Sequence, residues 1–381
     1  KIKIYVALLI FCLGASVATA FETNAKAAYI YDLTSGTVLL SKNADVPLPP
    51  ASMSKLMTLY IAFEFIRAGQ LRLDEKLPVS AHAESYGGST MFLDTTDRVS
   101  VHDLLRGIIV LSGNDACAVI AEALSPDGSE AGFAKLMTRR AQQMGMTNST
   151  FQNSNGWPHP THRMSMRDLG LLTTRLIEDF PEFYDMFSQT EFEFDGRAPA
   201  NTRNRNPLLG LGIGADGLKT GHTQEAGYGL VGSAQQGERR IIFVLSGLSS
   251  VSQRADEAEA VVNWAFRQFA ARNFGKAGDI VTQAKVWDGS SANVGMALSK
   301  DLTTLVPELG TGEVEFEVEY LNPIPAPITK GAIIGNLVVK TPELEDTRVP
   351  LVAAEGVARG GFFRRVLTVG QSLLLQANAA N

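Results

Sequence analysis

The sequence predicts an α+β protein: a large domain of helices around an antiparallel sheet, a small all-β domain, and a C-terminal amphipathic helix. Three observations support this prediction. Strand-like runs near the N-terminus give way to many segments with helical spacing, and strand-like runs return at residues 228–248. Beyond residue 274, short β-favouring runs are separated by Gly and Pro. The 381 residues also exceed the usual size of one domain.

The composition suits a globular protein and gives no sign of a nucleic-acid partner. Hydrophobic residues make up 45% of the chain and charged residues 19%, so a filled core is expected. The formal net charge is -6, which is not the basic balance that a phosphate backbone attracts. We therefore expect no nucleic acid among the partners.

The first 20 residues have the order of a secretory signal peptide. Lys1 and Lys3 precede an apolar run at 4–13, and small residues follow at 18–20. The run is shorter than the roughly 20 residues of a membrane span, so a transmembrane helix is the weaker interpretation. A lipoprotein site at Cys12 is also weaker, because Phe11 stands where a small residue is expected. We predict a secreted, periplasmic protein whose mature chain starts at residue 21.

Removal of this leader leaves Cys117 as the only cysteine, so no disulfide is expected within the mature chain. A lone cysteine on an apolar helix is usually a small buried residue. Stability must then come from packing.

The large domain is predicted over residues 21–274. Runs at 28–33 and 37–41 flank a Thr-Ser-Gly turn and predict a hairpin, and a helix is expected over 52–66. Strands are expected at 228–233 and 240–248. Together with the hairpin they predict one sheet that joins both ends of the domain. Further helices are predicted over 101–111, 115–124, 130–144, 166–179 and 256–269.

The small β-rich domain is predicted over residues 275–355. Residues 313–320 alternate Glu with apolar or aromatic residues, the pattern of a half-buried strand, and 331–340 form a second β-favouring run.

Three short motifs with chemical meaning follow one another along the chain. They are Ser52-x-x-Lys55, Ser112-x-Asn114 and Lys219-Thr220-Gly221. Each motif alone is weak, since Ser291-x-Asn293 repeats the second pattern by chance. The ordered set is specific, because penicillin-binding proteins and class A β-lactamases carry these three motifs in this order.

The first motif suits a nucleophile and its base. A serine hydroxyl is a poor nucleophile near neutral pH and needs a neighbouring base. Residues three apart on a helix share a face, so the Lys55 amine is expected beside the Ser52 hydroxyl. Burial and the positive charge of Lys219 are expected to lower the pKa of Lys55, and the helix N-terminus favours an oxyanion at Ser52.

The other two motifs suit proton relay and substrate binding. Gly113 is expected to allow the turn that presents Ser112 for proton relay and Asn114 for binding a substrate amide. Gly221 is expected to leave room for a peptide along a sheet edge. Lys219 and Thr220 are then expected to receive a terminal carboxylate.

Residues 50–58 (PASMSKLMT), 112–117 (SGNDAC) and 216–223 (DGLKTGHT) resemble the low-molecular-mass D-alanyl-D-alanine carboxypeptidases of the penicillin-binding protein five and six type. The resemblance also takes in residues 204–206 and the C-terminal β domain. It implies a β-lactamase/transpeptidase-like fold and a serine-type hydrolase. Such an enzyme removes the terminal D-Ala from peptidoglycan stem peptides through an acyl-enzyme, and β-lactams inhibit it.

The resemblance also implies roles for individual residues. Ser52, Lys55 and Ser112 would be catalytic, and backbone N–H groups of Ser52 and His222 would form the oxyanion hole. Arg254 would assist carboxylate recognition. The substrate-binding set is then Asn114, Lys219, Thr220, Gly221, His222 and Arg254. One departure is the run Leu208-Leu209-Gly210, where relatives often carry an aromatic residue after the paired leucines.

No metal and no cofactor are expected. His159 and His162 lie in a loop without an accompanying carboxylate pattern, and no nucleotide-binding glycine loop is present.

Two related activities and one different class remain as alternatives. A β-lactamase needs a carboxylate facing Ser52, and the sequence alone does not place Glu191 or Glu193 there. A D,D-endopeptidase differs in substrate rather than chemistry. An inactive cell-wall-binding protein is disfavoured by the complete motif set.

The C-terminal segment 356–381 is predicted to anchor the protein. Apolar residues between 362 and 374 recur near helical spacing, Arg364 and Arg365 fall to one side, and no acidic residue follows Glu355. This pattern predicts an amphipathic helix on the membrane surface, at the outer face of the inner membrane. The alternatives are a helix packed on the β domain and a disordered end.

Overall fold

The computed structural model describes residues 21–197, 200–308, 314–342 and 344–361. The predicted signal peptide and residues 362–381 of the predicted tail 356–381 lie outside the described residues. The start of that tail belongs to the β domain instead, because Val357 pairs with Ile328 and is buried in its core. Within the described ranges, the α+β domain and the separate all-β domain are both present, as the sequence predicts. No helix in these ranges has the length and apolar character needed to cross a membrane.

A five-stranded antiparallel sheet organises the large domain. Its order is β2-β1-β7-β6-β5, with β1 at Ala27–Asp32, β2 at Thr37–Lys42, β5 at Ala215–Thr223, β6 at Gly227–Gln236 and β7 at Arg239–Leu248. The predicted N-terminal hairpin therefore pairs with strands from the end of the domain, through β1 and β7. Strand β5 is one edge of this sheet, and β2 is the other.

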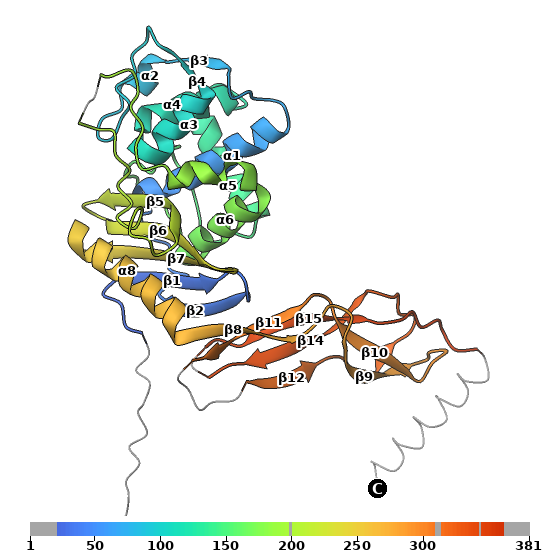
Figure 1. Cartoon of the computed structure of the whole chain (residues 1–381). Coiled ribbons are helices and arrows are strands. Elements are labelled where there is room, and N and C mark those ends of the chain that lie inside the picture. The colour runs from blue at the N-terminus through green and yellow to red at the C-terminus, as the bar shows by residue number, and fades with distance from the viewer. Residues whose placement is uncertain (1–20, 198–199, 309–313, 343, 362–381) are drawn as a thin grey trace, which may run out of the picture.

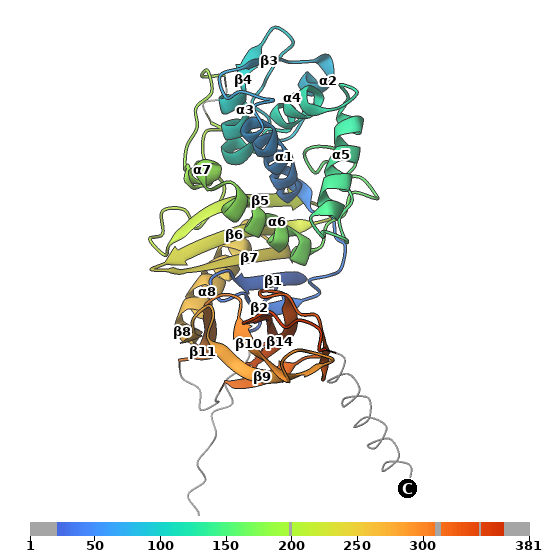
Figure 2. The ribbon, with the colours of Figure 1, turned by 90° about the vertical axis from the view of Figure 1, so that its right-hand side faces the viewer.

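Helices cover both faces of the sheet because its side chains alternate between two cores. Tyr29 and Val244 belong to the core under α6 (Met166–Asp179), whereas Ile30 and Leu245 belong to the core under α8 (Val251–Gln268). Figures 1 and 2 show the remaining helices gathered beyond the β5 edge. They are α1 (Lys55–Arg67), α2 (Ala81–Glu84), α3 (Val101–Arg106), α4 (Asn114–Leu124), α5 (Glu130–Gln143) and α7 (Pro181–Tyr184). The same region contains 3₁₀ turns at Ala51–Ser54 and Asp185–Ser188. It also contains a small strand pair, β3 (Lys76–Pro78) with β4 (Arg98–Ser100).

Two predicted helices differ from the structure in informative ways. Helix α8 begins at Val251, five residues earlier than predicted, because the Ser250 side chain accepts a hydrogen bond from the Gln253 N–H and caps the helix. The predicted helix 101–111 is α-helical only to Arg106. Residues Gly107–Leu111 form a π-helical turn, a conformation often found next to functional sites.

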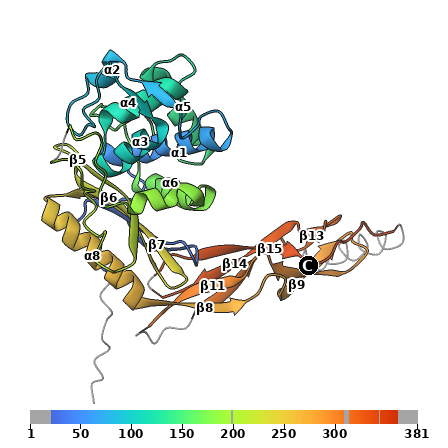
Figure 3. The same cartoon turned by 45° about the horizontal axis from the view of Figure 1, so that its top comes forward.

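The C-terminal part is all β, and β8 (Phe269–Gly275) continues directly from α8 into it (Figure 3). A six-stranded sheet has the order β12-β14-β15-β10-β9-β13, and β8 pairs with β11 (Leu302–Pro307). The other strands are β9 (Ile280–Trp287), β10 (Asn293–Leu298), β12 (Glu315–Glu319), β13 (Ile324–Pro325), β14 (Ile333–Lys340) and β15 (Thr347–Ala353). Strand β12 is less buried than its alternation predicts, because it is the edge strand of this sheet.

Candidate active site

The Ser52 turn sits between helix α1 and the edge strand β5. Ser52 lies in the 3₁₀ turn that leads directly into α1, and Lys55 is the first residue of that helix. The prediction that the Lys55 amine lies beside the Ser52 hydroxyl is confirmed, because the Lys55 Nζ atom lies 2.8 Å from the Ser52 Oγ atom. Lys55 is fully buried, whereas Ser52 lines a cavity of about 250 Å³.

The Lys55 amine has three oxygen neighbours. Besides Ser52 Oγ, Nζ lies 2.7 Å from Asn114 Oδ1 and 2.7 Å from the Asn155 carbonyl oxygen. The pKa of Lys55 is lowered from 10.5 to about 8, chiefly by burial and with a smaller contribution from the positive charge of Arg205. This shift raises the share of neutral amine near neutral pH by about 300-fold. A neutral amine beside a serine hydroxyl has the arrangement of a general base and a nucleophile.

Lys219 lies deeper than the sequence suggests. It is 3% exposed, and the residues that line the cavity do not include it. Burial, Lys55 and Arg205 hold the pKa of Lys219 well below its usual value. Its neighbours Thr220, Gly221 and His222 do line the cavity, and the His222 ring stacks on Tyr228 with centroids 3.9 Å apart.

Ser112 reaches the cavity through an unusual backbone conformation. The residue that turns the chain is Ser112 itself, at φ 62° and ψ 35°, and not Gly113 as the motif suggests. Gly113 is needed for space instead, since a Cβ atom there would lie 3.1 Å from Asp115 Oδ1 and 3.2 Å from the Ala116 Cβ atom. A left-handed serine is strained, and such strain is concentrated at functional sites.

Gly221 has a structural task in addition to the predicted one. A Cβ atom at this position would lie 3.0 Å from Met53 Cγ and 3.0 Å from the Pro50 carbonyl oxygen. The missing side chain therefore makes room for the turn that carries Ser52. It is this close approach that places Ser52 against the edge of the sheet.

Arg205 lines the Ser52 cavity, although the sequence suggested no individual role for it. Its guanidinium donates to Ser89 Oγ at 2.8 Å and to the Leu111 carbonyl at 2.7 Å. Arg254 lines the same cavity and is 6% exposed. No carboxylate is among the residues that line this cavity in the described part of the chain, so two guanidinium groups face it without an anionic partner. The only sequence signal for Arg205 was its place between two asparagines.

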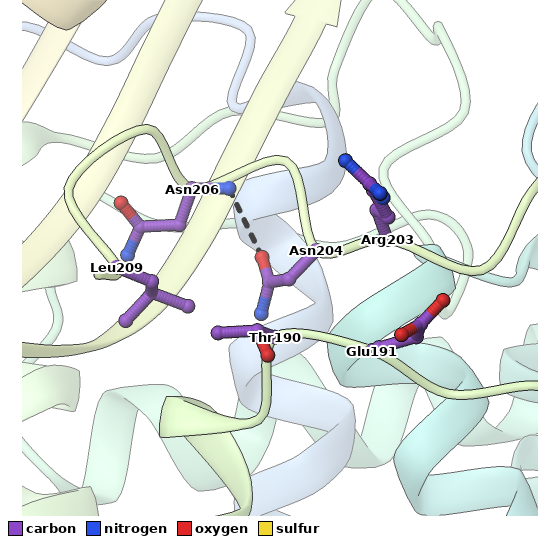
Figure 4. A pocket seen from close by; sticks show the side chains of 6 residues that line it. All are labelled: Thr190, Glu191, Arg203, Asn204, Asn206 and Leu209. Atoms are coloured by element: carbon purple, nitrogen blue, oxygen red, sulfur yellow. Dashed lines mark hydrogen bonds between the residues drawn. The ribbon is translucent and has the colours of Figure 1, made fainter.

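Those asparagines hold the segment that carries Arg205. Asn206 donates from its backbone N–H to Asn204 Oδ1 at 3.0 Å (Figure 4) and from its side chain to the Gly217 carbonyl of β5 at 2.9 Å. The segment also pairs with residues 190–192, through a bridge between Glu191 and Arg203. A separate pocket of about 340 Å³ opens here, lined by Thr190, Glu191, Arg203, Asn204, Asn206 and Leu209 (Figure 4).

The position of Glu191 bears on the β-lactamase alternative. Glu191 lines the pocket of Figure 4 and accepts a hydrogen bond from the Thr202 hydroxyl at 3.0 Å. Neither Glu191 nor Glu193 is among the residues that line the Ser52 cavity. The required carboxylate opposite Ser52 is therefore not supplied by either residue.

The run Leu208-Leu209-Gly210, where relatives often carry an aromatic residue, is partly buried and partly open. Leu208 is buried in the core under α8, and Gly210 has a φ of 89° with open space around it.

The remaining candidate residues have structural roles. His162 is buried, its Nε2 atom lies 2.8 Å from Ser54 Oγ, and burial lowers its pKa to about 4. Cys117 is free and buried, as predicted, and burial raises its pKa to about 12. In the part of the chain that the structure describes, no three His, Cys, Asp or Glu residues are arranged to hold a metal ion.

Comparison with known proteins assigns both parts of the chain. Residues 14–249 match the family described as D-alanyl-D-alanine carboxypeptidase, and residues 269–359 match the C-terminal domain of penicillin-binding protein 5. The D-alanyl-D-alanine carboxypeptidase DacC of Escherichia coli is 35% identical over 91% of this chain and 87% of its own length.

Solved structures agree with this assignment. Penicillin-binding protein 5 of Haemophilus influenzae matches 90% of this chain and 99% of its own chain at 31% identity, with a TM-score of 0.78. Penicillin-binding protein D2 of Listeria monocytogenes, in its ampicillin-bound form, matches 65% of this chain and all of its own at 32% identity, with a TM-score of 0.59. With the ordered motifs meeting in one cavity, these matches show that the chain belongs to the D-alanyl-D-alanine carboxypeptidase family.

Proposed function

We propose that this protein removes the terminal D-Ala from peptidoglycan stem peptides through an acyl-enzyme on Ser52. The observation that carries this proposal is the 2.8 Å contact between the Ser52 hydroxyl and a fully buried Lys55 amine, at the floor of a cavity without carboxylates among its described lining residues. The family is one of serine-type D-alanyl-D-alanine carboxypeptidases. Nothing in the structure or the relatives favours an endopeptidase or a β-lactamase.

The proposed reaction starts with a proton transfer. Neutral Lys55 takes the Ser52 hydroxyl proton while Ser52 Oγ attacks the carbonyl carbon of the penultimate D-Ala. Backbone N–H groups of Ser52 and His222 stabilise the oxyanion that forms. The peptide C–N bond then breaks. The leaving D-Ala amine receives the proton from Lys55 through Ser112, and water later hydrolyses the ester on Ser52.

Substrate binding is proposed to depend on the cationic character of the cavity. The free carboxylate of the terminal D-Ala interacts with the Thr220 hydroxyl and the Arg254 guanidinium. The Lys219 amine, buried next to Thr220, completes this group as a hydrogen-bond donor. Arg205 joins this group, because it faces the same cavity without an anionic partner among the described residues. Asn114 binds a substrate amide, and the backbone beside Gly221 provides the edge along which the peptide lies.

β-Lactams are proposed to react at the same serine. The ampicillin-bound form of the Listeria monocytogenes relative supports this, since that protein shares the catalytic part of this chain. A β-lactam resembles the peptide substrate, because the carbonyl carbon that Ser52 attacks lies close to a free carboxylate in both. We propose that the acyl-enzyme it forms is long-lived, because neither Glu191 nor Glu193 lines the cavity to activate water.

Secretion and membrane association are part of the proposal. The signal-peptide pattern of residues 1–20 supports export to the periplasm. The basic and apolar pattern from Phe362 onward supports peripheral attachment to the outer face of the inner membrane. Peptidoglycan stem peptides are accessible from that location.

The test compares two synthetic pentapeptides that differ only at the C-terminus. The peptide ending in free D-Ala-D-Ala should release one D-Ala, and the peptide with an amidated end should react at least about tenfold more slowly, because a charge-assisted hydrogen bond is lost. Ser52→Ala should abolish D-Ala release. Equal rates on both peptides would favour an endopeptidase, and activity in Ser52→Ala would reject the assignment of the nucleophile.

A further inference from the structure

The orientation of the Lys55 amine depends on a residue outside the three motifs. A neutral amine has two N–H groups and one lone pair. With the lone pair accepting the Ser52 hydroxyl proton, the two N–H groups donate to Asn114 Oδ1 and to the Asn155 carbonyl, each at 2.7 Å. Both acceptors are therefore needed to point the lone pair at Ser52. Asn114 belongs to a motif, whereas Asn155 comes from a loop that the function described above does not use.

The loop around Asn155 is held by the buried carboxylate of Glu130. Oε1 of Glu130 accepts hydrogen bonds from the backbone N–H and the hydroxyl of Ser154, the residue before Asn155. Oε2 lies 2.7 Å from His82 Nε2 and accepts from the Tyr86 hydroxyl at 2.7 Å. One carboxylate at the start of α5 thus connects the Asn155 loop to the segment that contains α2.

Two further contacts leave this loop little freedom. The Ser154 carbonyl accepts from the Thr58 hydroxyl of α1 at 2.6 Å. Gly156 has a φ of 82°, and a Cβ atom there would lie 1.9 Å from the Ala51 carbonyl oxygen. The loop therefore fits directly against the turn that carries Ser52, and a small displacement of Ser154 moves the acceptor of Lys55.

Glu130 is also a fixed negative charge. Burial raises its pKa, but the hydrogen bonds from Ser154, His82 and Tyr86 outweigh burial, and the pKa is lowered overall. The other ionisable groups that act on Lys55 are Cys117 and Asp115 of α4 and the Arg205 guanidinium, and Lys219 of β5 lies close enough for its own pKa to be lowered by Lys55.

We propose that Glu130, together with His82 and Tyr86, is a positioning residue that holds the Asn155 carbonyl and so orients the Lys55 amine toward Ser52. The proposal rests on the proposed acylation of Ser52 and adds a requirement to it. Glu130 does not touch the substrate cavity. Its effect therefore falls on the chemical step and not on substrate binding.

The test measures D-Ala release and penicillin acylation by Glu130→Gln across pH. In this variant, kcat and the acylation rate should fall about tenfold, while KM changes less than about twofold. The expected loss is only part of the roughly 10²–10⁴-fold acceleration that a general base supplies, because Lys55 is still present. The acidic limb of the pH profile should move to lower pH, because loss of the negative charge lowers the pKa of Lys55. Glu130→Asp keeps the charge but shortens the side chain. It should lower kcat without moving the limb.

The matched control is Glu122→Gln. Glu122, on the neighbouring helix α4, also accepts a serine hydroxyl, from Ser80 at 2.8 Å, but this contact lies at the start of α2 and not at the Asn155 loop. This variant should retain wild-type kcat and the wild-type pH limb. Tyr86→Phe and His82→Gln remove one Glu130 partner each and should lower kcat about two- to fivefold.

Several outcomes would overturn the proposal. Glu130 variants with kcat within twofold of wild type would do so. Glu130 would have a purely structural role if the loss of activity of the variants correlated with their loss of melting temperature and the acidic limb of Glu130→Gln did not move. Failure of the proposed function is distinguishable, because the wild-type protein would then release no D-Ala and form no penicillin adduct.

Discussion

Gly221 packs so closely against Met53, the residue after Ser52, that a Cβ atom at Gly221 would lie 3.0 Å from the Met53 Cγ atom. Strand β5 and the turn that carries the nucleophile are therefore in direct contact at this point. The position of Ser52 relative to the sheet edge depends on the absence of a side chain at residue 221.

Gly221→Ala should displace the Ser52 turn. We expect the rate of penicillin acylation to fall at least about tenfold, since small misplacements of reacting groups carry large rate penalties. Gly87→Ala is the control, because a Cβ atom at Gly87 meets no atom within 4 Å. Equal acylation rates for the two variants, measured by stopped-flow with a fluorescent penicillin, would contradict the packing argument.

The lowered pKa of Lys55 predicts the pH dependence of acylation. Lys55 acts as a base only when it is neutral, and its pKa is about 8. The acylation rate should therefore rise with pH through this value and level off above it, and not continue to rise toward pH 10.5. Lys55→Arg should lower the rate at least about 10²-fold at every pH, because a guanidinium does not give up its proton. A rate that does not change between pH 6 and 9 would exclude Lys55 as the base.

Arg205 should affect both substrate binding and the base. Arg205→Ala should lower kcat/KM for a peptide ending in D-Ala by about ten- to a hundredfold, which corresponds to the loss of a charge-assisted hydrogen bond. The acidic limb should move to higher pH, since the Arg205 charge lowers the pKa of Lys55.

Arg203→Ala is the control for Arg205→Ala. Arg203 lies two residues away, is exposed, and lines the pocket of Figure 4 instead of the Ser52 cavity. It should leave kcat/KM and the pH limb unchanged. If both variants behave alike, the effect comes from the loop as a whole and not from the Arg205 charge.

Several features of the fold were predictable because local signals determine them. Helix α6 has the predicted limits, and the Ser165 side chain that caps it accepts from the Asp168 N–H. The contact of Lys55 with Ser52 follows from their spacing of three residues. The π-helical turn Gly107–Leu111 was not predictable, since five consecutive small or apolar residues give no sign of a change in helical hydrogen bonding.

The parts of the site that the sequence did not indicate come from distant segments. Asn155 lies 100 residues from Lys55, and its contact uses a backbone carbonyl, which any residue type provides. The left-handed conformation of Ser112 is imposed by tertiary packing, because serine has no intrinsic preference for it. Arg205 carries a common charge in a polar loop, so only its place in the folded cavity distinguishes it.

The C-terminal segment should be required for membrane attachment and not for catalysis. Val357 is buried in the core of the β domain and pairs with Ile328, so the truncation should remove only residues 362–381. The truncated protein should stay in the soluble fraction with anionic vesicles and retain the wild-type rate of penicillin acylation. Co-sedimentation equal to that of the longer chain would contradict the anchor.

The most direct test of the account is the mass of the intact protein after incubation with penicillin, followed by peptide mapping. We predict one covalent adduct per chain, located on Ser52, that persists for minutes and is absent in Ser52→Ala. An adduct on another residue, or turnover to free penicilloate within seconds, would contradict the assignment of Ser52 as the nucleophile of a carboxypeptidase.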